Sequence, residues 1–299
     1  MSFKKKLAHF YKAVNNHPLA SKYKIKAYFN FLNWQISQVL KPGVRRISFV
    51  GNTSLIVKKG MTGATGNIYF GLHEFEEMSF LLHFLNKVDT FYDVGANIGS
   101  YTILAAGVCG AKACSFEPVP STFNFLKENV SVNKLDESVT LYMVAVGAAE
   151  GHIKITDALD TVNHVMQEIG VNQNTGIDVP VVSLDDITTY DYPSLIKIDV
   201  EGYETEVLNG MNALLKDSTL KAIIIELNGS GNRYGYHENL IHEKLLKHTF
   251  LPYTYDGFNR KLILLDHYSN CNTIYVRDVE TVKERLKNSP LVKIFNRSF

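Results

Sequence analysis

Short apolar runs that alternate with segments of helical periodicity dominate the chain from about residue 75 onward. Runs of this length, bounded by turn residues, predict buried strands, here at 90–94, 113–116, 139–146, 194–200 and 220–226. Segments with apolar residues at helical spacing predict helices over 75–88, 120–133, 205–215 and 237–248. This alternation predicts an α/β domain with a mostly parallel sheet. Three later strands, near 253–255, 261–265 and 273–276, are expected to be antiparallel.

The first 64 residues follow another pattern. Residues 3–40 predict two helices with a break between Asn15 and Pro18, and the second has a wide apolar face that we expect to dock on the body. Two short strands around Gly51-Asn52 and a flexible loop over 60–66 follow. We therefore expect a basic, mainly helical N-terminal extension with a short hairpin, residues 1–64, and a separate domain, residues 65–299.

Charge is distributed unevenly, although the formal net charge of the 299 residues is only +1. Residues 1–73 contain twelve Lys or Arg and no acidic residue, which leaves 19 basic and 30 acidic side chains for the rest. Either this basic segment packs on the acidic body of its own or a neighbouring chain, or it contacts an anionic membrane surface or an acidic partner such as a glycan. The sequence favours the first interpretation and leaves the oligomeric state open.

The compartment follows from cysteine spacing and from the apolar runs. Cys109, Cys114 and Cys271 form no zinc or disulfide pattern, which favours a reducing environment. No apolar run is long enough to cross a bilayer, and no signal-peptide core follows the basic start at Lys4 to Lys6. We therefore expect a cytoplasmic protein, peripheral to the membrane if the basic segment binds one.

The stretch around Gly95 holds the strongest local signal. A buried strand ends at Asp93-Val94, Gly95 and Gly99 follow four residues apart, and helical spacing begins at Tyr101. Strand, glycine turn and helix form the opening unit of a nucleotide-binding α/β domain. The glycines are expected to let a ligand approach the backbone, and free N–H groups at the start of the helix favour an anion.

The residues around this turn distinguish between ligands. A dinucleotide turn has the pattern Gly-x-Gly-x-x-Gly, whereas here Asn97 stands between Gly95 and Gly99. Glu117, at the end of the run 113–116, stands where an acid binds ribose hydroxyls at the tip of the second strand. Asp93 would repel a pyrophosphate but suits an ammonium group. S-adenosylmethionine has a ribose and an ammonium group but no phosphate, so the pattern favours it over NAD.

Three segments together resemble the FkbM family of S-adenosylmethionine-dependent methyltransferases. They are Asp93-Val-Gly-Ala-Asn-Ile-Gly99, Phe116-Glu-Pro118, and Ile196-Lys-Ile-Asp-Val-Glu-Gly-Tyr-Glu204 followed by Glu206-Val-Leu-Asn-Gly210. The resemblance covers about residues 65–277 and implies a class I methyltransferase domain, a Rossmann-like α/β fold with a seven-stranded, mostly parallel sheet. It implies that the glycine turn takes the methionine end of the cofactor. The expected cofactor-binding residues are Asp93, Gly95, Ala96, Asn97, Gly99, Glu117, Pro118, Ala145 and Asp199.

Methyl transfer to a hydroxyl requires an oriented acceptor and a group that takes its proton. Asp199 and Glu201 follow the fourth strand, at the switch point of the sheet where ligands bind, and are the first candidates. His164, in a polar stretch over 157–178 that we expect to lie over the site, is the third. Glu204, one turn further on, is expected to be exposed to solvent.

Two further polar features of the strands need an interpretation. Asp199, Glu226 and Asn228 could bind a divalent cation, but no ligand spacing requires one, and we expect no metal. Lys197 interrupts the apolar fourth strand, where a charge is costly, and we expect it to pair with an acid at the far end of the sheet.

The sequence thus predicts an enzyme that transfers a methyl group from S-adenosylmethionine to a hydroxyl oxygen. Known substrates of the FkbM family imply a small-molecule or carbohydrate acceptor. An Asp-Pro-Pro-Tyr type of motif, used on the amino groups of bases, is absent, so no nucleic-acid partner is expected. Two alternatives stay open: an NAD(P)-linked dehydrogenase, and a non-catalytic cofactor-binding or scaffold domain.

Overall fold

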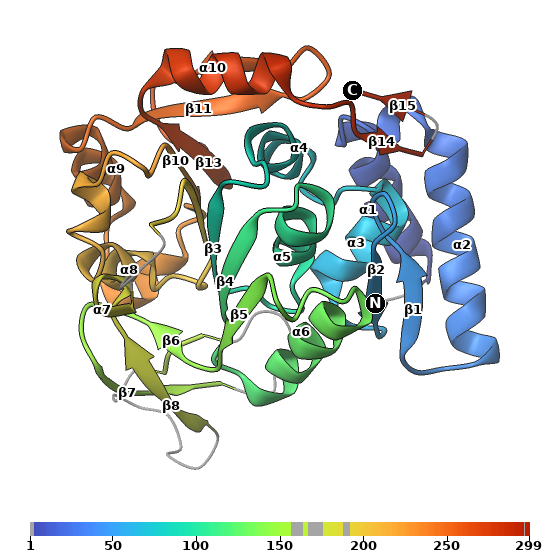
Figure 1. The fold of residues 1–299 in the computed structure, drawn as a ribbon. Helices are drawn as coiled ribbons and strands as arrows, with labels where there is room; N and C mark the ends of the chain where they lie inside the picture. The colour runs from blue at the N-terminus through green and yellow to red at the C-terminus, as the bar shows by residue number, and fades with distance from the viewer. Residues whose placement is uncertain (1–2, 157–163, 167–175, 188–191, 296) are drawn as a thin grey trace.

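A central sheet of eight strands organises the protein. The computed structural model describes residues 3–156, 164–166, 176–187, 192–295 and 297–299. The strand order is β12-β11-β13-β10-β9-β3-β4-β5 (Figure 1). In chain order these strands are β3 (Thr90–Val94), β4 (Lys112–Phe116), β5 (Val139–Tyr142), β9 (Leu195–Ile198), β10 (Ala222–Glu226), β11 (Leu251–Asp256), β12 (Lys261–Leu264) and β13 (Asn272–Val276).

Strand directions confirm the expected fold class. The five strands from β5 to β10 pair in parallel, whereas β13 pairs antiparallel with both β10 and β11. This is the mostly parallel, Rossmann-like sheet expected of a class I methyltransferase, and the hairpin strand β12 extends the expected seven strands at one edge. The chain runs outward from β3 to β5 and resumes with β9 on the other side of β3. The switch point therefore lies between β3 and β9, where their carboxyl ends meet.

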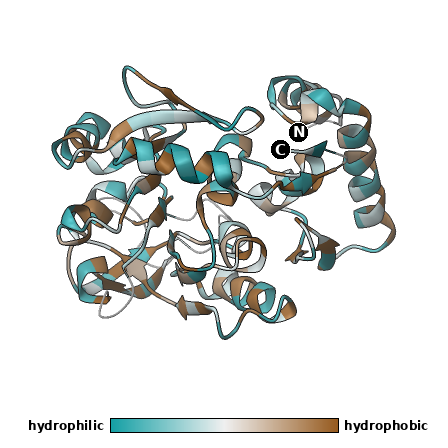
Figure 2. Ribbon diagram, turned by 45° about the horizontal axis from the view of Figure 1, so that its top comes forward, coloured by the Kyte–Doolittle hydropathy of each residue, from teal (hydrophilic) through white to brown (hydrophobic). Residues whose placement is uncertain are grey.

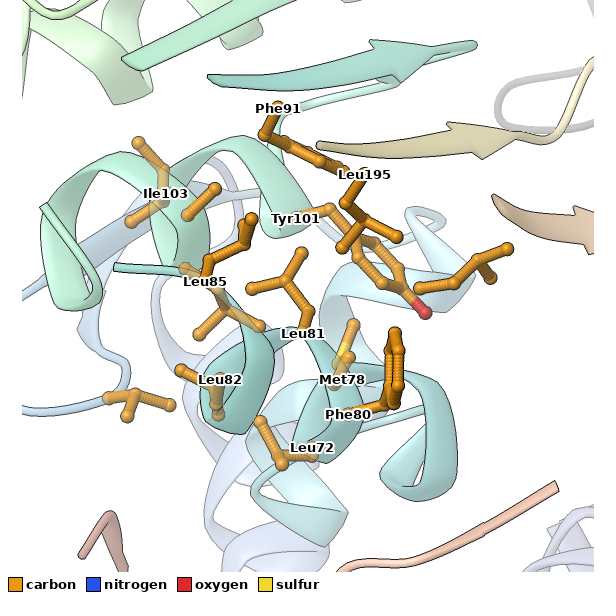
Figure 3. Packing of buried hydrophobic residues seen from close by; sticks show 14 of the residues in the cluster. Leu72, Met78, Phe80, Leu81, Leu82, Leu85, Phe91, Tyr101, Ile103 and Leu195 are labelled. Carbon is orange, nitrogen blue, oxygen red and sulfur yellow. The ribbon is translucent and has the colours of Figure 1, made fainter. Parts of the chain in front are cut away.

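Helices cover both faces of the sheet because successive strand residues point to opposite faces. On one face Phe91 and Leu195 join a core with helices α4, α5, α6 and α10, part of which Figure 3 shows. On the other face Tyr92 and Ile196 join a second core with α8 and α9. These helices are α4 (Phe75–Phe84), α5 (Ser100–Ile103), α6 (Pro120–Val132), α8 (Glu204–Asn209), α9 (Glu238–Lys247) and α10 (Val279–Asn288). Each fully buried Leu or Phe contributes about 1.5–3 kcal/mol to stability.

The expected third strand, 139–146, is divided between two sheets. Its first half is β5, and its second half, β6 (Ala145–Val146), belongs to a three-stranded sheet with β7 (Gly151–Ile155) and β8 (Ile177–Val182). Of the loop expected over 157–178, residues 157–163 and 167–175 lie outside the described part, and the last residues begin β8. The helix expected over 205–215 ends at Asn209, and a 3-10 turn at Leu214–Lys216 follows. The short elements α7 (Leu184–Ile187), β14 (Lys293–Ile294) and β15 (Arg297–Ser298) were not anticipated.

The N-terminal segment forms a helical layer at the right edge of Figure 1. Its elements are α1 (Phe3–Asn16), α2 (Lys24–Leu40), the antiparallel hairpin β1 (Arg45–Ser48) and β2 (Ser54–Val57), and α3 (Thr62–Phe70). The expected break is confirmed, and His17 holds it: its Nδ1 accepts from the Ala20 amide at 3.0 Å, and its Nε2 contacts the Leu72 carbonyl oxygen at 2.8 Å. The prediction of a flexible loop over 60–66 was wrong, because most of these residues form the start of α3.

The proposed boundary between residues 64 and 65 falls inside α3, and the division into two domains stays a prediction. The extension also contacts the body at the end of α6, where the Ser54 amide of β2 donates to Asn133 Oδ1 at 2.8 Å. In the part of the chain that the structure describes, no helix is both long and apolar enough to cross a membrane.

Candidate active site

Two cavities open at the carboxyl ends of β3, β4, β9 and β10, and they meet at the switch point. Both are lined by Gly95, Asn97, Asp199 and Glu201. The first cavity extends toward β4 and the small sheet of β6, β7 and β8. The second extends toward α3 and α4. The two expected candidates Asp199 and Glu201 therefore stand where the cavities join.

The first cavity is mainly apolar, and a single buried acid stands in its wall. Its lining includes Phe116, Val119, Ala145, Val146 and Ile153, with Pro118 beside the acid Glu117. Glu117 is 7% exposed, and its Oε2 accepts from the Asn97 amide while Oε1 accepts from the Val119 amide, each at 3.0 Å. Burial raises the pKa of Glu117 to about 7, although the two amide donors act the other way. The expected residues Glu117, Pro118 and Ala145 thus line one cavity.

Four amides of the glycine turn donate within the chain, whereas the anion site expected at the start of α5 stays a prediction. The Gly95 and Ala96 amides donate to the Phe116 carbonyl oxygen at 3.0 and 2.9 Å, and the Gly99 amide donates to Ala96 at 2.8 Å. The Asn97 amide is bound by Glu117. A turn whose donors are occupied in this way offers little to a phosphate and suits a ligand without one.

The glycines serve close packing within the chain. Gly95 has a φ of +80°, and a Cβ there would lie 1.8 Å from the Asp199 carbonyl oxygen. Gly99 has a φ of +89°, and a Cβ there would lie 2.6 Å from Leu126 Cδ1. Both positions thus favour glycine for conformation, and Gly95 also requires it for space, because its close contact is with backbone. At Gly95 the close approach is to the backbone of the neighbouring strand tip, whereas the sequence had suggested approach of a ligand.

The second cavity is polar and collects charged side chains from several elements. Strand β3 contributes Asp93, and β10 contributes Glu226. Strand β9 contributes Lys197, and Asp199 follows directly after it. All four lie on the face of the sheet that α4 covers. Glu74 and Tyr101 complete this wall, and the Tyr101 hydroxyl donates to Glu74 Oε2 at 2.8 Å.

Lys197 lies in the site and pairs with Asp199, so the expected partner at the far end of the sheet was wrong. Its Nζ lies 2.8 Å from Asp199 Oδ2, and its side chain is 4% exposed. Burial alone would lower the pKa of Lys197, but the carboxylates of Asp199, Glu74 and Asp93 outweigh burial and raise it. The ammonium group therefore stays charged and holds the Asp199 carboxylate in place.

Asp93 binds the helix that follows the glycine turn. Its Oδ2 accepts from the Thr102 amide at 3.0 Å and from the Thr102 hydroxyl at 2.6 Å. Burial raises the pKa of Asp93, against the effect of Lys197 and of these donors. The side chain thus orders the first turn of α5 and borders the second cavity. Its expected contact with an ammonium group stays a prediction.

Three carboxylates converge where the cavities join. One oxygen of each of Asp199, Glu201 and Glu226 lies within 4.8 Å of the others. Burial, followed by the charge of Asp199, raises the pKa of Glu201 to about 6 and that of Glu226 to about 8. Oxygen ligands at this spacing could hold a divalent cation, but Lys197 already supplies a positive charge to Asp199. The expectation of no metal stays a prediction.

Two acids after β9 have distinct roles. Glu201 has a φ of +54°, unusual for a residue with a side chain, and it lines both cavities. Glu204 is 3% exposed, so its expected exposure was wrong. Its Oε1 accepts from the amides of Val200 and Gly202 at 3.2 and 3.1 Å and so fixes the loop that carries Glu201. A positive φ at a residue with a side chain, as at Glu201, is a form of backbone strain that is common at ligand sites.

His164 borders the first cavity, beside Val165 and Ile155. Its amide donates to Thr156 Oγ1 at 3.0 Å, and its carbonyl oxygen accepts from the Thr156 amide at 3.0 Å. His164 thus lines the same cavity as Ala145 and Glu117 and is not among the residues that line the second cavity, whereas Asp199 and Glu201 line both. Its role as a base stays a prediction.

Sequence reasoning missed Tyr101 and the position of Lys197 in the site. One signal could have placed Lys197 in the site. It lies two residues before Asp199, and residues two apart in an extended strand point to the same face of the sheet. Glu74 precedes α4 and reaches the site through the packing of that helix on the sheet.

A pH-dependent stability follows from Glu204. Burial raises the pKa of Glu204 from 4.5 to about 7, so between these values the folded protein binds more protons than the unfolded chain. The free energy of unfolding therefore falls as pH rises through this window, by about 3 kcal/mol for this group when it is fully ionised. We expect the melting temperature of Glu204→Gln to exceed that of the wild type by more at pH 8 than at pH 5. An equal difference at both pH values would contradict the buried, protonated state of Glu204.

Comparisons with known proteins agree with this geometry. Residues 93–251 match the model of the family described as "Methyltransferase FkbM domain". A hexuronic acid methyltransferase, AglP, of Haloferax volcanii is 29% identical over 152 residues, 49% of this chain and 59% of the relative. The chain therefore spans less than two thirds of the length of that curated relative.

The solved structures with some similarity to this chain include a methyltransferase FkbM from Methylobacillus flagellatus KT. It has a TM-score of 0.44 and 16% identity, covering 71% of this chain and 54% of that one. A precorrin-6y C5,15-methyltransferase from Geobacter metallireducens GS-15 has a TM-score of 0.39 and 14% identity, covering 69% and 89%. The family model matches more than half of the residues and includes the glycine turn, Glu117 and the acids after β9, and the chain belongs to the FkbM methyltransferase family.

Proposed function

We propose that this protein transfers a methyl group from S-adenosylmethionine to a hydroxyl oxygen of a small-molecule or carbohydrate acceptor. The observation that carries the proposal is the meeting of an apolar cavity and a polar cavity at Gly95, Asn97, Asp199 and Glu201. Family membership supports it and disfavours the dehydrogenase alternative. The occupied amides of the glycine turn also disfavour a pyrophosphate cofactor.

The residues present fit the proposed cofactor. The apolar walls of the first cavity suit an adenine, and Glu117, held by two amides at the tip of β4, suits a ribose diol. The charged groups of the second cavity suit an amino-acid moiety, which carries both an ammonium and a carboxylate. When bound, the cofactor supplies the electrophilic methyl group.

The chain's own residues would orient the acceptor and take its proton. Glu201 and Asp199 stand at the junction of the cavities, and Glu201, with a pKa of about 6, is ionised at neutral pH. Lys197 fixes the carboxylate of Asp199 by a bond of 2.8 Å. Asp199 then orients the acceptor hydroxyl, and Glu201 accepts its proton.

A carbohydrate acceptor is supported by the relative named as a hexuronic acid methyltransferase and by the polar lining of the second cavity. Asn67, His73 and Ser100 border that cavity at α3 and at the start of α5. Among the described residues, His73 Nδ1 is buried without a hydrogen-bond partner. The Asn67 side chain already pairs with the Ser100 hydroxyl and the His73 amide, so the support for a carbohydrate acceptor lies in the polar character of this lining as a whole.

Glu117→Ala is expected to weaken S-adenosylhomocysteine binding by about 1.5–3 kcal/mol, the size of a lost charge-assisted hydrogen bond. Isothermal titration calorimetry measures this, with NAD as the control ligand and Glu117→Gln as the variant of matched volume. The Gln variant should lose less affinity than the Ala variant, because its side-chain oxygen can still accept from one backbone amide. Unchanged affinity in Glu117→Ala would refute the assignment of the ribose site.

Turnover with a panel of sugars and uronic acids tests the proposed reaction. The assay follows S-adenosylhomocysteine release, and the methylated position is located by mass spectrometry. Methylation of a sugar hydroxyl supports the proposal. Binding of the cofactor without turnover on any member of the panel favours the non-catalytic alternative, and binding of NAD alone favours the dehydrogenase.

A further inference from the structure

The outer face of α2 exposes large apolar side chains that the fold leaves uncovered. They recur at intervals of four and three residues along the helix and so form one stripe. The α2 stripe consists of Ile25, Phe29, Leu32, Ile36, Val39 and Leu40. Their exposed fractions run from 46% at Leu32 to 88% at Ile25, and the helix lies at the edge of the molecule (Figures 1 and 2).

The inner face of the same helix accounts for its packing on the protein. Ala27, Phe31 and Trp34 are buried there. Phe31 contacts the Tyr69 ring of α3 at a centroid distance of 5.3 Å, and Asn30 donates to the Ile68 carbonyl oxygen at 2.9 Å. The expected docking of α2 on the body is therefore confirmed, but only for this face. The α2 stripe has no role in that contact.

Charge around the α2 stripe is entirely positive. Lys24 and Lys26 flank its first turn, Lys41 and Arg46 follow its last turn, and all four are exposed. No acidic residue occurs among residues 1–73. Among the described residues, none of these four side chains forms an ion pair with an acid of the body. The surface thus combines exposed apolar side chains with uncompensated positive charge.

We propose that the α2 stripe docks on an anionic membrane surface. An apolar helix face bordered by lysines inserts at the boundary of headgroups and acyl chains, and anionic lipids attract the flanking charges. A second copy of this chain is a poorer partner for the same face. Pairing two α2 helices, parallel or antiparallel, would place lysines against lysines with no acid in the segment to offset the repulsion.

Docking through α2 would also orient the site. The helix α3 packs against α2 on one side, and its residues Gly63, Ala64 and Asn67 line the second cavity on the other. Two packed helices, α2 and α3, therefore separate the cavity from the proposed membrane surface.

Vesicle co-sedimentation of the full-length protein tests this proposal. The vesicles are phosphatidylcholine alone or phosphatidylcholine with phosphatidylglycerol, at low and raised salt. We expect sedimentation with the anionic vesicles only, weakened by salt. Lys26→Glu/Lys41→Glu should reduce the partition coefficient by about tenfold or more, and Phe29→Ser/Ile36→Ser should reduce it similarly. The control Leu240→Ser, at an equally exposed site on α9, should bind like the wild type.

Circular dichroism and the melting temperature confirm that each variant is folded. The proposal is overturned if the wild type stays in the supernatant with anionic vesicles, or if Phe29→Ser/Ile36→Ser binds them as the wild type does. A dimer in sedimentation velocity that dissociates in this stripe variant would also overturn it, in favour of a second copy. The result does not depend on methyl transfer, since it needs neither cofactor nor acceptor.

Discussion

Asp199→Asn is expected to lower kcat by about 10²-fold, the loss typical of misplacing a reacting group by about 1 Å. The affinity for S-adenosylhomocysteine should change far less. The reason is that Asp199 stands at the junction of the two cavities, fixed by Lys197 at 2.8 Å. The measurements are steady-state turnover, calorimetric affinity and melting temperature of the same protein sample.

A pH profile tests the electrostatic coupling between Asp199 and Glu201. Burial and the charge of Asp199 raise the pKa of Glu201 to about 6, so kcat/KM should rise with pH through about 6 as Glu201 ionises. Asp199→Asn removes that charge, and the rising limb should move to lower pH. A limb that stays in place would contradict this coupling, whereas a purely structural role of Asp199 would lower the melting temperature and leave kcat nearly unchanged.

Lys197→Met serves as the matched control, because it removes the ion pair and keeps the Asp199 carboxylate. We expect a smaller loss of kcat than in Asp199→Asn, together with a loss of stability. Turnover in Asp199→Asn equal to that of the wild type would contradict the assignment, and so would an equal loss in the two variants.

Gly95→Ala is expected to abolish cofactor binding and to destabilise the fold strongly. A Cβ at this position would lie 1.8 Å from the Asp199 carbonyl oxygen, so the tips of β3 and β9 would have to separate. Separation there would displace Asp199 and the turn that binds Glu117. Calorimetry with S-adenosylhomocysteine and thermal unfolding measure the two effects.

Gly235→Ala provides the control for backbone conformation. Gly235 has a φ of +76°, close to that of Gly95, but nothing lies within 4 Å of a Cβ there. Its cost should therefore be that of the left-handed conformation alone, about 1–2 kcal/mol, with cofactor affinity retained. If the two variants lost equal stability and bound the cofactor equally well, the close contact at Asp199 would not matter.

The order of strands and helices was readable from the sequence because it rests on local periodicity. Apolar runs such as those around Phe91 and Ile196 are short and continuous, as expected of strands buried on both faces. The glycine turn and Glu117 were also readable, since their spacing from the strand ends is local. Boundaries were less certain: α3 was read as a loop because its glycines and threonines, Thr62 to Gly66, are poor helix formers.

The second cavity was not readable in the same way. Glu74 and Lys197 are more than a hundred residues apart, and α3, α4, β9 and β10 contribute to one wall only when they pack. Lys197 was assigned to the far end of the sheet because the sequence shows which face of the strand it shares, but does not show toward which end of the strand its long side chain extends. Glu204 was read as exposed because a charged residue after a turn usually is, whereas the structure uses it to bind two backbone amides.

The sequence by itself determined the fold class, the glycine turn, Glu117 and the acids after β9, because each depends on residues close together along the chain. Only the tertiary structure decided that Lys197 pairs with Asp199, that the amides of the turn are occupied, and that one face of α2 stays uncovered. The first two features depend on contacts between distant segments, whose free energy comes from burial and charge in the folded state. The apolar periodicity of α2 is visible in the sequence, but only the packing on α3 decides which of its faces is covered.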